Sequence, residues 1–179
     1  MSPYPTFCRA VVEPYLSTIM PQSTPVLDSK LDKLLRLVRV GATHVGKGVF
    51  ARRRLKAELV LGEVLGVIMR EHPEDSSYCM ELQSGNLLEP APPLRFVNHS
   101  CDPNCELFYW FDEDQSTQED RLWLQTTRPI EPGEELSIDY CWPADAAIPC
   151  RCGAPNCRQW IVDPDELHLL GPQDGAASP

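Results

Sequence analysis

The sequence predicts a mainly β domain, and its apolar residues and its prolines carry that prediction. Short apolar runs recur between glycine, proline and polar turn residues, which is typical of short strands in small sheets. The chain of 179 residues contains 18 prolines, so long uninterrupted helices are not expected. Its length is sufficient for one domain with a hydrophobic core of its own.

The N-terminal part is predicted to be largely irregular. Prolines recur through residues 1–27, where they interrupt any regular element. Asp28 or Ser29 can cap a short helix that runs through Leu34. Apolar residues interleaved with arginine over residues 35–40 predict the first strand.

Further short strands are predicted where β-branched, aromatic and aliphatic residues gather, with Gly62 and Gly66 marking turns between two of them. An acidic polar stretch, residues 112–120, lies between two such runs and predicts a long hairpin with a solvated tip. The predicted strands are residues 59–61, 64–69, 78–82, 107–111, 122–126 and 136–140.

The formal net charge of −10 argues against binding nucleic acid directly through bulk electrostatics. It is complementary to a basic protein substrate rich in lysine and arginine, although acidity also serves solubility. No apolar run reaches the roughly 18 residues of a membrane span. Residues 1–15 lack the basic start and apolar core of a secretory signal, so an intracellular protein is expected. The sequence carries no signal for an oligomeric state.

Four motifs concentrate the chemistry. Residues 95–104, Arg-Phe-Val-Asn-His-Ser-Cys-Asp-Pro-Asn, offer hydrogen-bonding side chains and a thiol at the edge of an apolar run. Residues 46–48 form a Gly-x-Gly, where glycine permits close approach of the backbone to a ligand. Residues 133–140 read Gly-Glu-Glu-Leu-Ser-Ile-Asp-Tyr, and residues 150–158 contain Cys-x-Cys-x4-Cys. Alone, the Gly-x-Gly is more often a plain hairpin turn.

In this order, the four motifs closely resemble those of the SET-domain family of protein lysine methyltransferases, including the cysteine-rich tail called post-SET. The resemblance covers roughly residues 35–162 and implies small β-sheets with a threaded pseudoknot, which would bring Asn98, His99 and Tyr140 together. It implies these divisions of the chain: an irregular lead-in at 1–34, a SET domain at 35–142, a post-SET zinc segment at 143–163 and a tail at 164–179 that is disordered at its end.

The activity implied by the resemblance is transfer of a methyl group from S-adenosylmethionine to the ε-amine of a lysine in a basic protein, such as a histone tail. The compartment would be the nucleus of a eukaryote or the cytoplasm of a bacterium. Tyr140 would be the catalytic residue and would orient the amine. The alternative to a cofactor role is a half-buried strand tyrosine for Tyr78 and a structural tryptophan for Trp160. The implied cofactor-binding residues are Gly46, Lys47, Gly48, Val49, Tyr78, Arg95, Phe96, Asn98, His99, Tyr140 and Trp160.

The cysteines at 150, 152 and 157 predict part of a zinc site, because structural zinc takes four ligands in a tetrahedron. The resemblance implies one structural zinc ion held by Cys101, Cys150, Cys152 and Cys157. Cys105 is the local rival for the fourth position. Reduced thiols or a disulfide are the alternative, although Cys150 and Cys152 are too close in sequence for an easy bridge. The remaining cysteines, Cys8, Cys79 and Cys141, are expected to serve packing.

Two positions depart from the family pattern. Val64 and Ile138 stand where many members carry aromatic residues, unless Phe108, Tyr109 or Trp110 replaces them in the lysine channel. These departures predict a roomier aliphatic channel that tolerates more than one methyl group. They also leave a second class of function open, in which a zinc-stabilised module on the same fold binds basic tails without catalysis.

Overall fold

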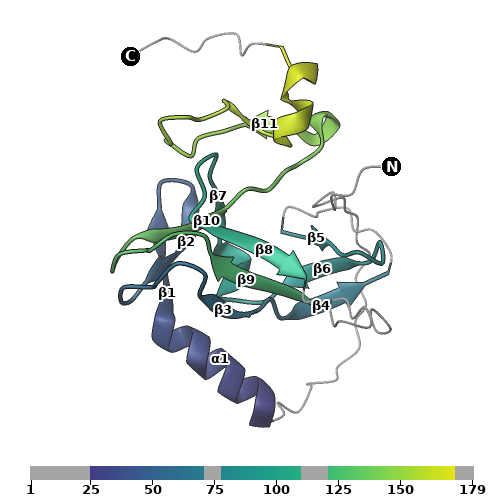
Figure 1. The fold of residues 1–179 in the computed structure, drawn as a ribbon. Coiled ribbons are helices and arrows are strands. Elements are labelled where there is room, and N and C mark those ends of the chain that lie inside the picture. The colour runs from purple at the N-terminus through teal and green to yellow at the C-terminus, as the bar shows by residue number, and fades with distance from the viewer. Residues whose placement is uncertain (1–24, 71–77, 110–120, 172–179) are drawn as a thin grey trace.

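The computed structural model describes residues 25–70, 78–109 and 121–171. Within them lies one α-helix, α1 (Pro25–Leu37), and the rest of the regular structure is short strands and 3-10 turns, which confirms the mainly β prediction (Figure 1). The strands are β1 (Val38–Thr43), β2 (Gly46–Ala51), β3 (Val60–Glu63), β4 (Gly66–Met69), β5 (Met80–Glu81), β6 (Leu87–Pro90), β7 (Asn98–His99), β8 (Cys105–Tyr109), β9 (Leu122–Thr126), β10 (Glu135–Ile138), β11 (Ile148–Pro149) and β12 (Trp160–Ile161).

The start of the chain corrects two predictions. Helix α1 begins at Pro25 and continues to Leu37, so the capping at residue 28 or 29 and the strand at 35–37 are wrong. Leu34 is buried and Leu37, three residues further on, packs against the same core, so the apolar face of a helix outweighs the apolar–arginine alternation. The first strand therefore begins at Val38.

The other predicted strands appear, β9 with the predicted ends and the rest with shifted ends. The β8–β9 hairpin is antiparallel, with Cys105 opposite Thr126 and Tyr109 opposite Leu122. Strand β6 was not predicted, because its two leucines stand beside a glutamate and a proline. The predictions for the hairpin tip at 112–120, most of the lead-in and the end of the tail lie outside the described residues.

The strands form several small sheets. Sheet orders are β1-β2-β10-β7, β3-β9-β8, β4-β6-β5 and the two-stranded β11-β12. Strand β10 is antiparallel to β2 and parallel to β7, which pairs Ser137 with Asn98 and Ile138 with His99. Two of the sequence motifs are thereby placed side by side, as expected, although they lie far apart along the chain. The threading of a pseudoknot stays a prediction.

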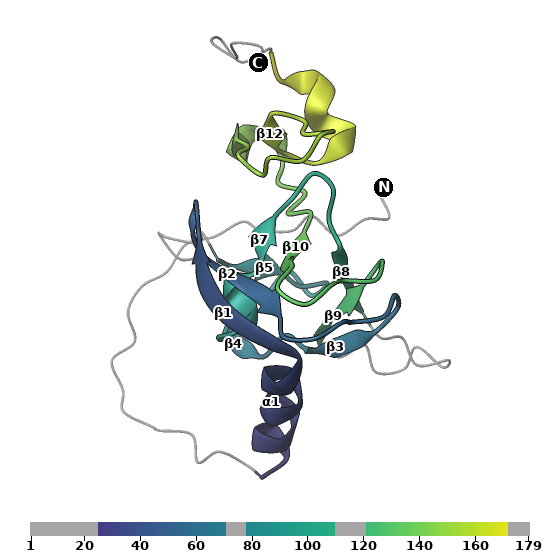
Figure 2. The same ribbon diagram turned by 90° about the vertical axis from the view of Figure 1, so that its left-hand side faces the viewer.

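The core lies between these sheets and α1, and β10 runs through it. Fully buried residues of this core include Val38, Val49, Leu55, Leu122, Leu124, Ile130 and Leu136. The C-terminal segment with β11, β12 and the 3-10 helix η3 (Pro164–Leu169) lies beyond the ends of β7 and β10, at the side of the molecule opposite α1 (Figures 1 and 2). None of the helices in the described part of the chain is long and apolar enough to span a membrane.

We expect Leu136→Ala to lower the free energy of unfolding by about 3 kcal/mol, because truncating a fully buried leucine leaves a cavity in the core. Leu169→Ala is the matched control, since this leucine is 62% exposed and its loss should cost under about 0.5 kcal/mol. Urea denaturation of the two variants measures the difference. Equal losses would contradict the placement of β10 at the centre of the core.

Candidate functional site

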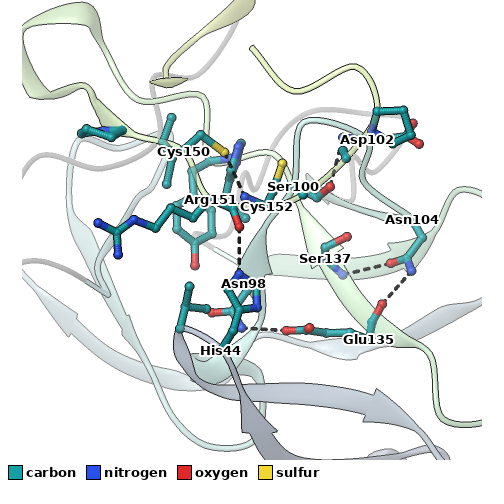
Figure 3. Close-up of a pocket in the computed structure, with 18 of the residues that line it drawn as sticks. His44, Asn98, Ser100, Asp102, Asn104, Glu135, Ser137, Cys150, Arg151 and Cys152 are labelled. Carbon is teal, nitrogen blue, oxygen red and sulfur yellow. Dashed lines mark hydrogen bonds between the residues drawn. The ribbon is translucent and has the colours of Figure 1, made fainter. Parts of the chain in front are cut away.

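A cavity of about 690 Å³ lies where the β1–β2 turn, strands β7 and β10 and the C-terminal segment meet (Figure 3). His44 lines it from the β1–β2 turn, Asn98 and Glu135 from the strands, and Cys150 and Arg151 from the C-terminal segment. Its volume is within the usual range for sites that enclose small ligands. The walls therefore come from segments that are distant in sequence.

Asn98 is held in one orientation at the cavity wall. Its amide nitrogen donates to the Lys47 carbonyl at 2.9 Å and to the Glu135 carboxylate at 2.7 Å. Gly48 makes room for this arrangement, because a side chain there would collide with the Glu135 carboxylate. With both amide hydrogens used, the Asn98 oxygen is left to accept a hydrogen bond from a bound ligand.

His99 connects the cavity to the cysteines. Its Nδ1 accepts a hydrogen bond from the Tyr140 backbone N–H at 3.2 Å, so Nε2 carries the proton. That nitrogen lies 3.4 Å from the sulfur of Cys101. Burial lowers the pKa of His99 to about 4, although the Asp139 carboxylate opposes this effect. The ring is therefore neutral at physiological pH and can donate to the sulfur.

Tyr140 separates two cavities. A second, smaller cavity of about 30 Å³ has an apolar and aromatic lining that includes Leu107, Ile138 and Trp142. Among the described residues that line either cavity, only Tyr140 belongs to both. Its hydroxyl donates to the Val97 carbonyl at 2.9 Å, and its ring lies 5.5 Å from that of Trp142. A reaction between groups bound in the two cavities would take place beside this hydroxyl.

The sulfur atoms of Cys101, Cys150, Cys152 and Cys157 lie within 4.8 Å of one another. Cys101 is 3.7 Å from Cys150 and 4.0 Å from Cys157, whereas sulfurs in a tetrahedron with bonds of roughly 2.3 Å are about 3.8 Å apart. A disulfide would need about 2.05 Å. The four thiols therefore fit a tetrahedral metal ion.

Backbone groups complete this fit. The N–H groups of Cys152, Arg158 and Gln159 each point at a cluster sulfur at 3.4 Å, as charged thiolates require. Cys105 lies in the hydrophobic core at 1% exposure and belongs to no such cluster among the described residues, so the rival for the fourth position is not supported.

Several residues with a predicted cofactor role do not line the larger cavity. Tyr78 and Arg95 line the smaller one, where the guanidinium of Arg95 stacks on the Tyr78 ring at 4.0 Å. The Lys47 ammonium lies over the Phe96 ring at 4.9 Å, and Trp160 of β12 pairs with Pro149 of β11. The residues that fall outside the larger cavity are Gly46, Lys47, Gly48, Val49, Tyr78, Arg95, Phe96 and Trp160. Their contact with a cofactor stays a prediction.

Sequence reasoning assigned no role to several residues that shape the site. Glu135 and Asn104 lie inside two of the motifs, and Asn104 is 2% exposed and bonded to the backbone of Glu135 and Ser137. The His44 ring bonds the Arg151 carbonyl at 2.8 Å and joins the β1–β2 turn to the C-terminal segment. Trp142 follows β10 in a stretch without periodic pattern, so no signal could have found it.

Fold and site together define a small β protein with two adjoining cavities and a four-thiol cluster beside them. The family model described as the SET domain matches residues 46–141, so the chain belongs to the SET-domain family. It is 31% identical to histone-lysine N-methyltransferase 2D of Homo sapiens over 134 residues, which is 65% of this chain and 2% of that protein. It is 41% identical to histone-lysine N-methyltransferase ash1 of Drosophila melanogaster over 88 residues, 45% of this chain and 4% of that protein.

Among solved structures, the chain is similar to KRYPTONITE in complex with mCHH DNA, an H3(1-15) peptide and SAH. The TM-score is 0.60 at 25% identity, over 69% of this chain and 29% of that one. The chain thus spans a small part of the relatives and structures it matches, and it shares with them the domain that carries the site.

We expect the purified protein to contain one metal ion per chain and Cys152→Ser to lose it, because the variant leaves three thiolates. Cys141→Ser, outside the cluster, should keep it. Burial raises the pKa of the Cys101 thiol to about 11, so binding must displace a proton and affinity should fall as pH falls. Elemental analysis and chelator titration at several pH values measure these effects. Retention of the metal by Cys152→Ser would contradict the site.

Proposed function

We propose that this chain is an S-adenosylmethionine-dependent protein-lysine N-methyltransferase that acts on a basic protein, such as a histone tail. The observation that carries the proposal is the position of Tyr140 between a cavity large enough for a nucleoside cofactor and a narrow one whose apolar and aromatic walls suit the methylenes of a lysine. The SAH and the H3 peptide bound in the similar solved structure support the same pairing of ligands.

The larger cavity offers groups that fit the cofactor. The Asn98 amide oxygen is oriented as an acceptor for an ammonium group. S-adenosylmethionine, when bound, supplies a methyl group on a sulfonium. Residues 148–155 of the C-terminal segment line the other side of this cavity and would cover the bound cofactor there.

The smaller cavity prepares the lysine. A free lysine has a pKa of roughly 10.4, so its amine must lose a proton before it can attack. Apolar and aromatic walls at Leu107, Ile138 and Trp142 disfavour the ammonium form. Tyr140 orients the neutral amine toward the methyl group, and this alignment supplies much of the acceleration. Phenol titrates near roughly 10, so Tyr140 is better suited to orientation than to proton abstraction.

The metal of the cysteine cluster is proposed to be zinc in a structural role. Four thiolates close the coordination sphere and leave no open position for catalysis. Cys101 follows the Asn98–His99 strand, while Cys150 and Cys152 line the cavity, so the ion would tie the cavity wall to the strand that binds the cofactor. Loss of zinc should therefore loosen that wall.

Histone-lysine methyltransferases among the relatives and the net charge of −10 both favour a histone substrate, and hence the nucleus as the place of action. The same charge disfavours direct contact with nucleic acid. A binding module without catalysis is the competing function. Tritiated S-adenosylmethionine with core histones and overlapping histone-tail peptides separates the two, because a module would bind peptides and transfer no label.

Tyr140→Phe is expected to reduce methyl transfer by about 100-fold, because it removes the oriented hydroxyl beside the reacting groups. Affinity for SAH should change less than about threefold, since the ring remains. Tyr109→Phe is the control, because its hydroxyl bonds the Glu81 carbonyl away from both cavities. Full activity of Tyr140→Phe would refute the assigned role.

Product analysis tests the channel. Ile138 lines the smaller cavity, and neither Phe108 nor Tyr109 does, although Trp142 adds a ring that the sequence did not predict. We expect more than one methyl group per lysine, and Ile138→Phe should restrict the product toward monomethyllysine because the ring fills space. Mass spectrometry at saturating cofactor measures the distribution. Monomethyl product alone from the unaltered protein would contradict a permissive channel.

A further inference from the structure

Asp139 is a carboxylate at the wall of the smaller cavity, between Ile138 and Tyr140, and the proposed function gives it no task. Its side chain is 18% exposed, so solvent screens its charge only partly. A negative charge beside an apolar channel stabilises an ammonium ion. Left alone, Asp139 would therefore oppose the loss of a proton that a lysine substrate requires.

The C-terminal segment supplies a compensating charge. The Arg158 guanidinium donates to the Asp139 carboxylate at 2.7 Å, and its own side chain is only 14% exposed. The same nitrogen donates to the Val162 carbonyl at 3.1 Å, and the Arg158 backbone N–H points at the Cys101 sulfur. Arg158 is thus held from both sides, next to the last cysteine of the cluster.

The other charged and titratable groups around Asp139 do not compensate its negative charge, so the pairing with Arg158 determines it. His99 lies 3.4 Å from the carboxylate with its unprotonated Nδ1, and the Cys141 backbone N–H donates at 3.2 Å. Arg95 lines the same cavity but is paired with Glu89. The Cys141 thiol also interacts with Asp139 and is uncharged, because burial raises its pKa to about 12. The further titratable side chains at the lining are Tyr78, Cys79 and Tyr140. Without Arg158, one uncompensated negative charge would remain.

We propose that Arg158 neutralises Asp139 so that the channel accepts the lysine substrate as a neutral amine. The inference rests on the proposed function and adds a residue to it. Arg158 acts through Asp139 and does not touch the reacting atoms, so it is a positioning residue that sets the electrostatics of the channel. The post-SET segment then contributes a charge to the lysine channel as well as a wall to the cofactor cavity.

The test is the pH dependence of kcat for the peptide methylated fastest in the screen above, because kcat reports ionisations in the enzyme–substrate complex, where the lysine lies in the channel. Arg158→Gln should move the acidic limb of the kcat profile upward by about one pH unit and lower kcat about tenfold near pH 7.5, with recovery at alkaline pH. Arg158→Lys keeps the charge and should keep the profile. Asp139→Asn should move the limb downward, and the double variant Asp139→Asn/Arg158→Gln should return it to the original position.

A binding measurement provides a readout independent of turnover. With SAH bound, calorimetry compares that peptide with one carrying norleucine in place of the target lysine. Arg158→Gln should raise the lysine-to-norleucine affinity ratio about tenfold near pH 7.5, since the ammonium gains an unpaired carboxylate. Metal content and thermal unfolding of each variant show whether the cluster and fold are intact.

An Arg158→Gln variant with metal and fold retained, but with an unchanged limb and affinity ratio, overturns the inference and leaves the proposed function standing. Activity lost equally at every pH does the same, because it indicates a structural role. Failure of the unaltered protein to methylate any peptide of the screen overturns the proposed function, and the inference with it.

Discussion

The parallel pairing of β10 with β7 is the constraint on which the rest of the structure depends. Strand β7 consists of Asn98 and His99 alone, and its partners in β10 are Ser137 and Ile138. This short ladder places the Asn98 amide at the cavity wall, a buried imidazole and the Tyr140 ring within one small volume. Asn104 secures it by bonding the β10 backbone at Glu135 and Ser137. Because parallel strands need a long crossover, no local turn could have produced this arrangement.

The cysteine cluster extends this constraint to the end of the chain. One sulfur comes from the segment after β7 and three from the C-terminal segment, so a bound ion would join these two parts of the chain. His99 donates to the first of these sulfurs, and Arg158 follows the last. The cluster is thus continuous, through hydrogen bonds, with both cavities. Structural and chemical roles cannot be assigned to separate parts of this domain.

Much of the site could be predicted, because its residues are grouped in short motifs whose chemistry is recognisable. The three clustered cysteines belong to this part, and so does the meeting of Asn98 and His99 with Tyr140, which the family resemblance implied. The fourth sulfur could not be derived from spacing, since Cys101 and Cys105 are separated from the other three cysteines by similar lengths of chain. Only the direction of β8 buries Cys105 in the core. Trp142 was missed for a similar reason: its place depends on the path of the chain after β10. Helix α1 was underestimated because arginines between leucines suit a strand and a helix face equally well.

The bond between the His44 ring and the Arg151 carbonyl has a thermodynamic consequence. It joins the two edges of the larger cavity, and the second edge is the segment that also carries three of the cluster sulfurs. An ion at the cluster and a ligand in the cavity would therefore order the same stretch of chain. The one that binds first loses part of the conformational entropy of this stretch, so the second binds with a smaller entropic penalty. Linkage makes the effect reciprocal. The factor by which the ion lowers the dissociation constant of the ligand equals the factor by which the ligand lowers the dissociation constant of the ion. At a low concentration of either one, the protein would bind the other more weakly.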